Sequence, residues 1–354
     1  MKKNHQITFA FIATFLSIFL PNTAKAQDSG IENTFLLGRD DAAKILTEYI
    51  APAPKIIGFA MAEGWYFTAQ PLKRGRWNIQ LNSSTAIGTE KDASYDLATL
   101  GLQNTATPNG TQTATIFGGS GTEVVNNKNN KTIELGTGFG EITPLDPSVI
   151  TLPNLQINIG LRKNTEISLR GLPPINVGSI SLRNYGFGIK HDIKQWIPSI
   201  SLSNFSMAIV ANVNYFSLQK GLESSVLRDP ATGATIPGPT DRSYKITSLQ
   251  YGGGIVFSKR IKLLTLMTGL RFDVITGTGE LKGTYTVFTP ATGGTNTGGD
   301  KQTDIGLISL NNSASRIGLN LGAKVKLGKF GVFLHGIVGN YSSFNFGFVF
   351  GKNE

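Results

Sequence analysis

The sequence predicts an all-β protein, an antiparallel transmembrane β-barrel of about 10–14 strands with a short N-terminal helical plug or cap. Three observations indicate this fold. Segments near the C-terminus alternate between apolar and polar residues, the N-terminus has the composition of an export signal, and short links alternate with longer ones. Because successive side chains of a β-strand point to opposite faces, an alternating segment has one face for lipid and one for a polar lumen.

Residues 1–26 have the organisation of a cleaved secretory signal peptide. Two lysines precede the apolar stretch Ile7–Leu20, and the small-residue motif Ala24-Lys25-Ala26 follows it. We therefore expect the mature chain to begin at Gln27. Beyond that point no apolar run of about 18 residues occurs, which argues against a helical membrane protein. The remaining compartments are the periplasm, the outer membrane and the exterior, and the alternating strands favour the outer membrane.

The composition is typical of a barrel and excludes several kinds of site. The chain has 42 glycines and only 16% charged residues, whereas a soluble domain has about 25%. It contains no cysteine, which excludes thiolate zinc sites, iron–sulfur clusters and a cysteine nucleophile. The formal net charge of +10 falls to +7 when the three lysines of the signal peptide are removed. The basic residues are scattered, so we expect them to meet lipid headgroups rather than nucleic acid.

Residues 27–75 are predicted to form the helical plug or hatch. Arg39–Ile50 has apolar residues at three- and four-residue spacing and two aspartates in its first turn, which predicts a helix. The proline-rich segment Ala51–Pro54 ends this helix, and a short apolar piece, Ile56–Ala62, follows. Two short helical pieces cannot form a domain alone. Their apolar side therefore needs a partner, either the barrel lumen or a periplasmic cap.

Residues 76–354 are predicted to form the barrel. Ten segments have strand patterns: Trp77–Leu81, Leu155–Leu161, Ile167–Leu169, Ser179–His191, Ile200–Tyr215, Tyr244–Phe257, Ile261–Phe288, Asp304–Leu327, Phe330–Val338 and Phe344–Phe350. In two of them the apolar set changes phase, which predicts β-bulges at Asn204 and at Arg183–Asn184. Gly252–Gly254 lie inside a strand, where glycines allow bending or the close approach of a plug.

The links between these segments alternate in length, as outer-membrane barrels require. The short ones are 162–164, 193–198, 258–260 and 328–329. The longer or more polar ones, together with two brief links on the same side, are 88–154, 173–178, 217–243, 289–303 and 339–343. The first of these could add hairpins near Tyr95–Leu102 and Thr132–Phe139. The rival fold, a secreted β-sandwich or propeller, is disfavoured because the charge is low and no fixed repeat occurs.

The alternation also predicts which polar side chains face the lumen. These candidates are Glu166, Arg170, Arg316, Asn320, Lys324, Lys326 and His335, together with Gln156 and Asn158. Mixed charge favours a solvated interior, and the basic surplus favours anions. Alternatively, these side chains form salt bridges with one another or with the plug.

Enzymatic and metal chemistry find little support in the sequence. His191 and Asp192 are adjacent in a strand and point to opposite faces, so they do not form a dyad. Barrel phospholipases use a histidine with serine and asparagine, but nothing fixes a serine near His335. The mature chain keeps two histidines far apart, so we expect no catalytic residues, no metal and no cofactor.

One part of the chain resembles a known family. The similarity is most specific within Pro147–Pro198, over the stretches Leu152–Leu161, Thr165–Pro173 and Tyr185–Pro198, and it extends to Gly64–Pro71 and Thr115–Gly118. These stretches resemble an uncharacterised family of outer-membrane β-barrels described only as a domain of unknown function. The resemblance covers most of the mature chain and implies the barrel, but it supplies no activity.

A second resemblance is architectural. The predicted N-terminal plug is similar to the helical hatch that long-chain fatty-acid transport barrels place in the lumen. The Asn-Pro-Ala motif of that hatch is absent here, and Ala51–Pro54 does not replace it. Hydrophobic-substrate transport is therefore an analogy from fold.

Three functions remain open from the sequence. We favour a barrel that passes a small molecule across the outer membrane and is gated by the plug. A hydrophobic molecule is one option for this cargo. The alternatives are a sealed structural or binding barrel whose external loops contact partners, and a barrel enzyme acting on lipid through His335. In each case the expected partners are outer-membrane lipids and the barrel-assembly machinery, with an unidentified cargo in the first and no nucleic acid.

Overall fold

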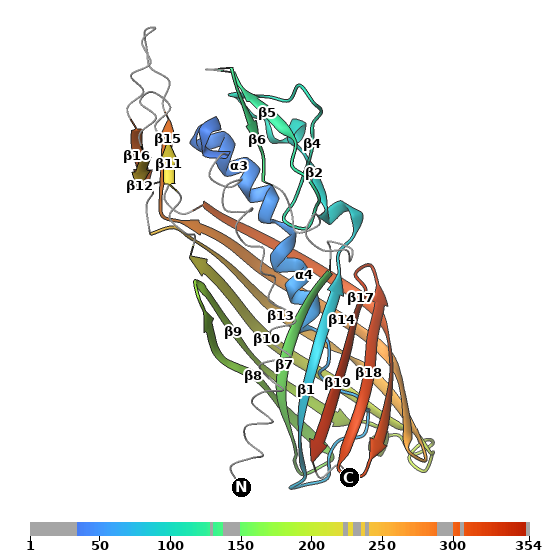
Figure 1. The fold of residues 1–354 in the computed structure, drawn as a ribbon. Coiled ribbons are helices and arrows are strands. Elements are labelled where there is room, and N and C mark those ends of the chain that lie inside the picture. Colours follow the sequence, from blue (N-terminus) through green and yellow to red (C-terminus); the bar gives the residue numbers. More distant parts are fainter. Residues whose placement is uncertain are drawn as a thin grey trace.

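A computed structural model describes residues 34–127, 130–136, 149–221, 226–228, 235–237, 241–288, 300–304 and 308–351. These residues form a closed antiparallel barrel, a helical segment that enters it from one end, and smaller strands beyond that end (Figure 1). The predicted signal peptide and the predicted mature start at Gln27 lie outside the described residues.

The barrel has ten strands, so the predicted fold is confirmed at the lower limit of its strand number. Neighbouring strands follow one another along the sheet, and β1 closes the barrel by pairing with both β7 and β19. In chain order the strands are β1 (Trp77–Ile87), β7 (Val149–Gly160), β8 (Thr165–Val177), β9 (Ile180–Asp192), β10 (Ser206–Gly221), β13 (Ser243–Ile261), β14 (Leu264–Lys282), β17 (Ile308–Leu327), β18 (Phe330–Gly339) and β19 (Ser343–Gly351).

The outer face of the barrel is apolar. Large hydrophobic side chains are exposed at every second position of the strands, among them Ile157, Leu169, Phe187, Ile255, Leu270, Phe272, Ile317, Leu319, Phe344 and Phe346. The alternate positions are buried and largely polar. This arrangement places an apolar band against lipid and polar groups in the lumen.

The two ends of the barrel differ in their connections. At one end the links are short: 161–164, 262–263 and 328–329, with 193–205 longer and containing the turn η5 (Lys194–Trp196). At the other end the links 88–148, 222–242 and 283–307 are long. Outer-membrane barrels have short periplasmic turns and longer outer loops, so we name these the periplasmic and the external end.

The structure corrects the two predicted bulges. Residues 200–205 precede β10 as turns, so the phase change at Asn204 is a strand boundary and not a bulge. β9 pairs with β10 without interruption through Arg183–Asn184. Its pairing with β8 shifts register opposite Arg183, and the additional residue lies in β8, between Leu172 and Ile175. The apparent phase change in β9 has another cause: Leu182 packs inside the barrel, because the external half of the lumen is apolar.

The predicted helix is confirmed as α3 (Arg39–Ile50), which follows the turn η1 (Phe35–Leu37). The prolines end α3 as expected, but they also begin α4 (Pro52–Met61) without a loop. Proline fits the first turn of a helix because its missing N–H would be unpaired there. In Figure 1, α3 lies beyond the external end and α4 runs into the barrel. Within the described residues, no helix is long and apolar enough to span a membrane.

Small strands occur in the regions of the first external link where the sequence predicts further hairpins, but they lie outside the barrel (Figure 1). Residues 94–96 pair with 112–114 and so form no hairpin within Tyr95–Leu102, whereas 123–126 pair with 131–134, and residues 137–139 lie outside the described residues. This link and the other two long ones contribute small strands: β2 (Ser94–Asp96), β3 (Thr105–Ala106), β4 (Gln112–Ala114), β5 (Glu123–Asn126), β6 (Lys131–Glu134), β11 (Val226–Arg228), β12 (Thr235–Pro237), β15 (Thr284–Phe288) and β16 (Asp300–Asp304), and the first link also contains the turns η2 (Glu90–Asp92) and η3 (Leu97–Leu100).

Helix α3 is attached to this external structure. The Asp41 carboxylate accepts hydrogen bonds from the Gln103 and Asn104 backbone N–H groups and from the Thr105 hydroxyl. A separate apolar cluster joins them, formed by Leu37, Ile45, Leu97, Val124, Ile133 and Leu135. Helix α3 and the small strands β2–β6 of the first external link therefore pack as one unit beyond the external end.

The absence of native cysteine allows a direct test of this orientation. Asp40→Cys places one thiol on an exposed position of α3, and Lys329→Cys places one at an exposed periplasmic turn. A membrane-impermeant maleimide applied to intact cells should label the first variant and not the second. Labelling of Lys329→Cys alone would reverse the assignment of the two ends.

Candidate functional site: a plug clamped in the barrel lumen

The lumen is occupied by the chain itself. After α4, residues 62–76 continue toward the periplasmic end and lead into β1. An eight-stranded barrel is filled by its own side chains, and ten strands leave room for one additional segment. We call residues 61–72 the lumen strap. It contacts eight of the ten barrel strands through Gln156, Glu166, Arg170, Lys190, Ser258, Arg271, Arg316, Asn320, His335 and Ser343.

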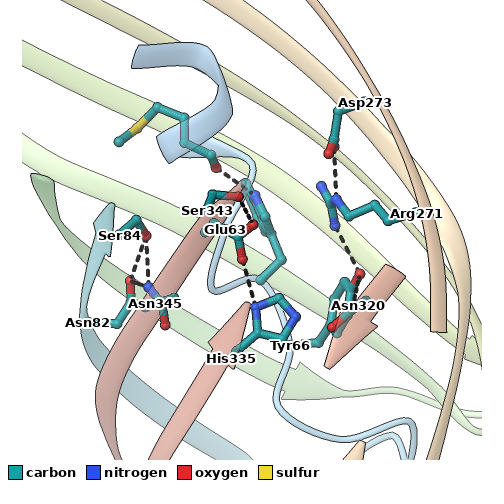
Figure 2. A network of polar contacts seen from close by, with 12 residues as sticks. Glu63, Tyr66, Asn82, Ser84, Arg271, Asp273, Asn320, His335, Ser343 and Asn345 are labelled. Carbon is teal, nitrogen blue, oxygen red and sulfur yellow. Dashed lines mark hydrogen bonds and ion pairs between the residues drawn. The ribbon is translucent and has the colours of Figure 1, made fainter. Parts of the chain in front are cut away.

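Glu63 is the centre of these contacts (Figure 2). Its Oε2 lies 2.7 Å from His335 Nδ1 on β18, and its Oε1 lies 3.6 Å from Arg316 Nη2 on β17. The Ser343 hydroxyl on β19 donates a hydrogen bond to Oε1 and accepts one from Arg316. Glu63 is fully buried and the three wall residues nearly so. Three adjacent strands thus supply the groups that hold one carboxylate of the plug.

A second group of charges continues this network along the wall. Asp273 accepts hydrogen bonds from Arg316 at 2.7 Å and from Arg271 at 2.8 Å. Arg271 and Asn320 both donate to the Tyr66 hydroxyl, at 3.1 and 3.0 Å (Figure 2). The lumen strap is therefore bound at a second side chain, three residues after Glu63.

The opposite wall holds the backbone of the lumen strap. Arg170 on β8 donates to the carbonyl oxygens of Met61 at 2.9 Å and Glu63 at 2.8 Å. Its guanidinium lies over the Trp65 ring, 3.9 Å from the ring centroid, where the negative face of the π-system attracts a cation. Gln156 on β7 donates to the Trp65 carbonyl oxygen.

Glycines on β9 make space for the Trp65 ring. A Cβ atom at Gly186 would lie 2.7 Å from that ring, and one at Gly188 would lie 2.9 Å from it. Gly64 is also constrained, because its φ of +71° is unfavourable for other residues and a Cβ there would meet Asn345 at 2.6 Å. The lumen strap therefore requires glycine at Gly186 and Gly188 of the wall and at Gly64 of the plug.

Nearer the periplasmic end, polar contacts hold the last part of the lumen strap. Glu166 accepts a hydrogen bond from the Leu72 backbone N–H at 2.8 Å and forms an ion pair with Lys190 at 2.9 Å. The Ser258 hydroxyl accepts from the Ala69 backbone N–H and lies 3.1 Å from the Thr68 hydroxyl. Polar contacts recur along the seam between strap and wall, and apolar contacts lie between them. Phe67 packs against Phe333 and Val349, and Trp65, Tyr66 and Ala69 pack in one cluster with Ala208, Val210, Val256 and Met267.

The external half of the lumen is held differently. There α4 packs against the wall and the first external link in one apolar cluster, whose buried members are Tyr49, Ile50, Ala53, Ile56, Ile57, Phe59, Ala60, Met61, Ala86, Ile116, Phe117, Phe216, Ile246 and Ile275. The external half of the lumen is therefore mainly apolar, whereas the periplasmic half combines polar and apolar contacts.

An ion pair links the plug to the turn η2 of the first external link. Lys55 of α4 pairs with Asp92 of η2 and lies 5.0 Å from the centroid of the Tyr341 ring. Burial acts to lower the pKa of Lys55, but the Asp92 carboxylate and Tyr341 outweigh it, so this pKa is raised above the usual value. The ammonium is therefore charged at neutral pH.

The predicted lumen residues divide into three groups. Arg316, Asn320 and His335 belong to the network around Glu63 and Tyr66, and Arg170 holds the same segment from the opposite wall. Glu166 and Lys324 are buried nearer the periplasmic end, where the Lys324 ammonium lies 4.2 Å from the Phe67 ring centroid. Lys326 is only partly buried.

Five residues of the network are not among those that the sequence predicts to face the lumen: Glu63, Tyr66, Arg271, Asp273 and Ser343. Two signals were present. Glu63 is the only acidic residue between Pro52 and Arg76, and Arg271 and Asp273 occupy the polar positions of an alternating segment. Partners across the lumen cannot be deduced from alternation, since it gives the face of a residue and not its depth.

The geometry at His335 differs from that of a serine hydrolase. There the imidazole takes the proton of the serine and an acid orients the imidazole. Here the Glu63 carboxylate lies between the two, bound to Ser343 on one oxygen and close to His335 with the other.

At the periplasmic end His191 contacts the Thr165 hydroxyl and the Trp196 ring, while Asp192 accepts a hydrogen bond from the Lys194 backbone N–H. The described residues contain no cluster suited to a metal ion.

The comparison with protein families identifies the chain. A family model described as a family of unknown function (DUF6588) matches residues 1–352. The chain belongs to this family. A search of curated proteins finds no match.

Several solved structures match the chain at low sequence identity and low TM-score. The chain is similar to the outer membrane protease OmpT from Escherichia coli, with a TM-score of 0.30, 11% identity, and coverage of 82% of this chain and 99% of that chain. It is also similar to the translocator domain of the autotransporter NalP from Neisseria meningitidis, with a TM-score of 0.25, 11% identity and coverage of 84% and 93%. For the toluene transporter TbuX from Ralstonia pickettii, the TM-score is 0.23 and the identity 8%, with coverage of 83% and 93%.

Neutralising Glu63 tests the clamp. Glu63→Gln leaves the buried guanidinium of Arg316 with one carboxylate instead of two, and loss of one member of a buried ion pair costs about 3 kcal/mol or more. The free energy of unfolding in urea, followed by tryptophan fluorescence, should fall by about that amount. The matched control Glu90→Gln, on an exposed side chain of η2, should stay within about 0.5 kcal/mol of the wild type. Equal stability of the two variants would contradict the clamp.

Proposed function

We propose that this outer-membrane barrel is a channel for a small molecule, closed at rest by its own N-terminal plug and opened when the lumen strap shifts. The observation that carries the proposal is the set of hydrogen bonds and ion pairs between residues 61–72 and the wall. Hydrogen bonds and ion pairs in such a seam can be exchanged for bonds to water. Withdrawal of the lumen strap would therefore leave a hydrated path, at a lower cost than exposure of an apolar interface.

The apolar cluster around α4 complements this seam. Because Ile56, Ile57 and Ile275 are buried in this apolar cluster, separating α4 from the wall would expose hydrocarbon to water. We therefore assign α4 the role of an anchor and the lumen strap that of the moving part. In this account the apolar outer band contacts outer-membrane lipids, the barrel-assembly machinery inserts the chain, and the cargo is a small molecule.

A sealed barrel is the second candidate. The external unit formed by α3 and β2–β6 favours it, since its own apolar cluster and the Asp41 hydrogen bonds make it a built structure rather than a set of loops. Such a barrel would serve as an anchor that presents this unit to partners. The third hypothesis, a lipid-acting enzyme, lacks support because Ser343 and His335 are both buried against the plug.

A reversible lock separates the two candidates. Thr68 and Ser258 meet through hydroxyl groups 3.1 Å apart, one on the lumen strap and one on β13. In the cysteine-free chain, Thr68→Cys with Ser258→Cys creates a single disulfide that ties the strap to the wall. In planar bilayers the oxidised double variant should be silent, and reduction should restore the openings that the wild type shows.

The single variant Thr68→Cys serves as the control and should behave as the wild type in both redox conditions. Equal conductance of the oxidised and reduced double variant would mean an open pore that needs no movement of the plug. Silence of the wild type, of the reduced double variant and of Glu63→Gln would contradict the channel and favour the sealed barrel.

A further inference from the structure

The barrel wall has a complete set of groups for binding a carboxylate, and the plug itself supplies the carboxylate that occupies them. Arg316, His335 and Ser343 come from three adjacent strands, all are nearly fully buried, and all converge on the Glu63 side chain (Figure 2). These groups belong to the fixed wall, whereas Glu63 belongs to the segment assigned above as movable. The two sides of the interaction can therefore separate.

The wall carries a surplus of positive charge once the plug is set aside. Beside Glu63, two buried cations of the wall, Arg271 and Arg316, share one buried anion, Asp273. A buried cation without a counter-charge is unfavourable. Movement of Glu63 out of the lumen would therefore leave the wall in need of an anion.

From this geometry we infer that the cargo is a small carboxylate, which binds the wall at Arg316, His335 and Ser343 in place of Glu63 and thereby releases the plug. The inference rests on the proposed channel function and names its substrate class. Glu63 acts as an internal mimic of the cargo: the closed state and the loaded state satisfy the same wall groups with the same functional group. Because a ligand shifts an equilibrium only through its different affinity for the two states, competition for one site supplies the coupling between binding and opening.

The shape of the site also limits the ligand. The Arg316 guanidinium is fixed by Asp273 on one side and lies 4.9 Å from the ring centroid of Phe59, which belongs to the anchored helix α4. These contacts orient the donors toward a planar group with two oxygens. A neutral amide of the same shape offers one oxygen and an N–H₂ group, which would face the cationic donors unfavourably.

Chemical rescue tests the wall site without requiring transport. Glu63→Ala removes the internal carboxylate, and sodium propionate is the probe that replaces it, with propionamide as the neutral isostere and sodium chloride to match ionic strength. The thermal unfolding midpoint of Glu63→Ala should rise with propionate, at a half-saturating concentration at least about tenfold below that of propionamide. The wild type and the control Glu90→Ala should need a much higher propionate concentration for the same shift, because Glu63 competes for the site in both.

A second variant, Glu63→Ser, repeats the test with acetate and acetamide in case the alanine variant does not fold. Equal responses to acid and amide, or no response, in every folded variant would overturn the inference. If rescue fails while the disulfide lock still governs conductance, the channel function stands and its cargo is not a carboxylate. If rescue succeeds and no plug-dependent opening occurs, the wall site is structural and the carboxylate is not a cargo.

In bilayers, propionate should raise the frequency of wild-type openings relative to chloride at equal ionic strength. The oxidised lock should abolish this increase, since the strap is then held at Ser258 whatever binds at Arg316. An increase that persists in the locked protein would contradict release of the plug by competition.

Discussion

The carboxylate of Glu63 determines how the inside of this barrel is arranged. It is the only acidic group that the chain supplies between Pro52 and Arg76, and it lies where the wall presents Arg316, His335 and Ser343. The desolvation of so many charges is costly, and it is offset only if each of them keeps a partner. Arg316 satisfies Asp273 and Glu63 together, so the clamp on the plug and the internal order of the wall are one network.

The lumen combines two kinds of packing that suit different tasks. Around α4 the contacts are apolar and close, which favours a single fixed position. Around residues 61–72 directional polar contacts are added to apolar ones, and glycines at 186 and 188 create the recess that Trp65 fills. In the proposed channel, the external end of the plug is the anchor and its periplasmic end is the part that moves. The division also explains why Leu182 and Phe216 face inward although they are apolar.

Much of this architecture could be predicted from the sequence, because strand alternation and helical spacing are local properties. Helix Arg39–Ile50 and the ten barrel strands follow from them. The two predicted bulges fail for different physical reasons. Near Arg183–Asn184 the external lumen is lined by hydrocarbon that packs on α4, so the apolar Leu182 faces inward, and at Asn204 the strand β10 has not yet begun. The pairing of Glu63 with His335 depends on the depth of two segments far apart in the chain. Only the three-dimensional register supplies that depth.

The central claim is that residues 61–72 are held in the lumen by the wall, and hydrogen–deuterium exchange measures it most directly. The Leu72 and Ala69 amides donate to the buried side chains Glu166 and Ser258, so in the folded barrel they should be protected well above the level of an unstructured peptide. In Glu63→Gln this protection should fall, while that of the β14 and β17 amides is retained. Exchange of the Leu72 and Ala69 amides at the rate of a free peptide in the wild type would contradict the account.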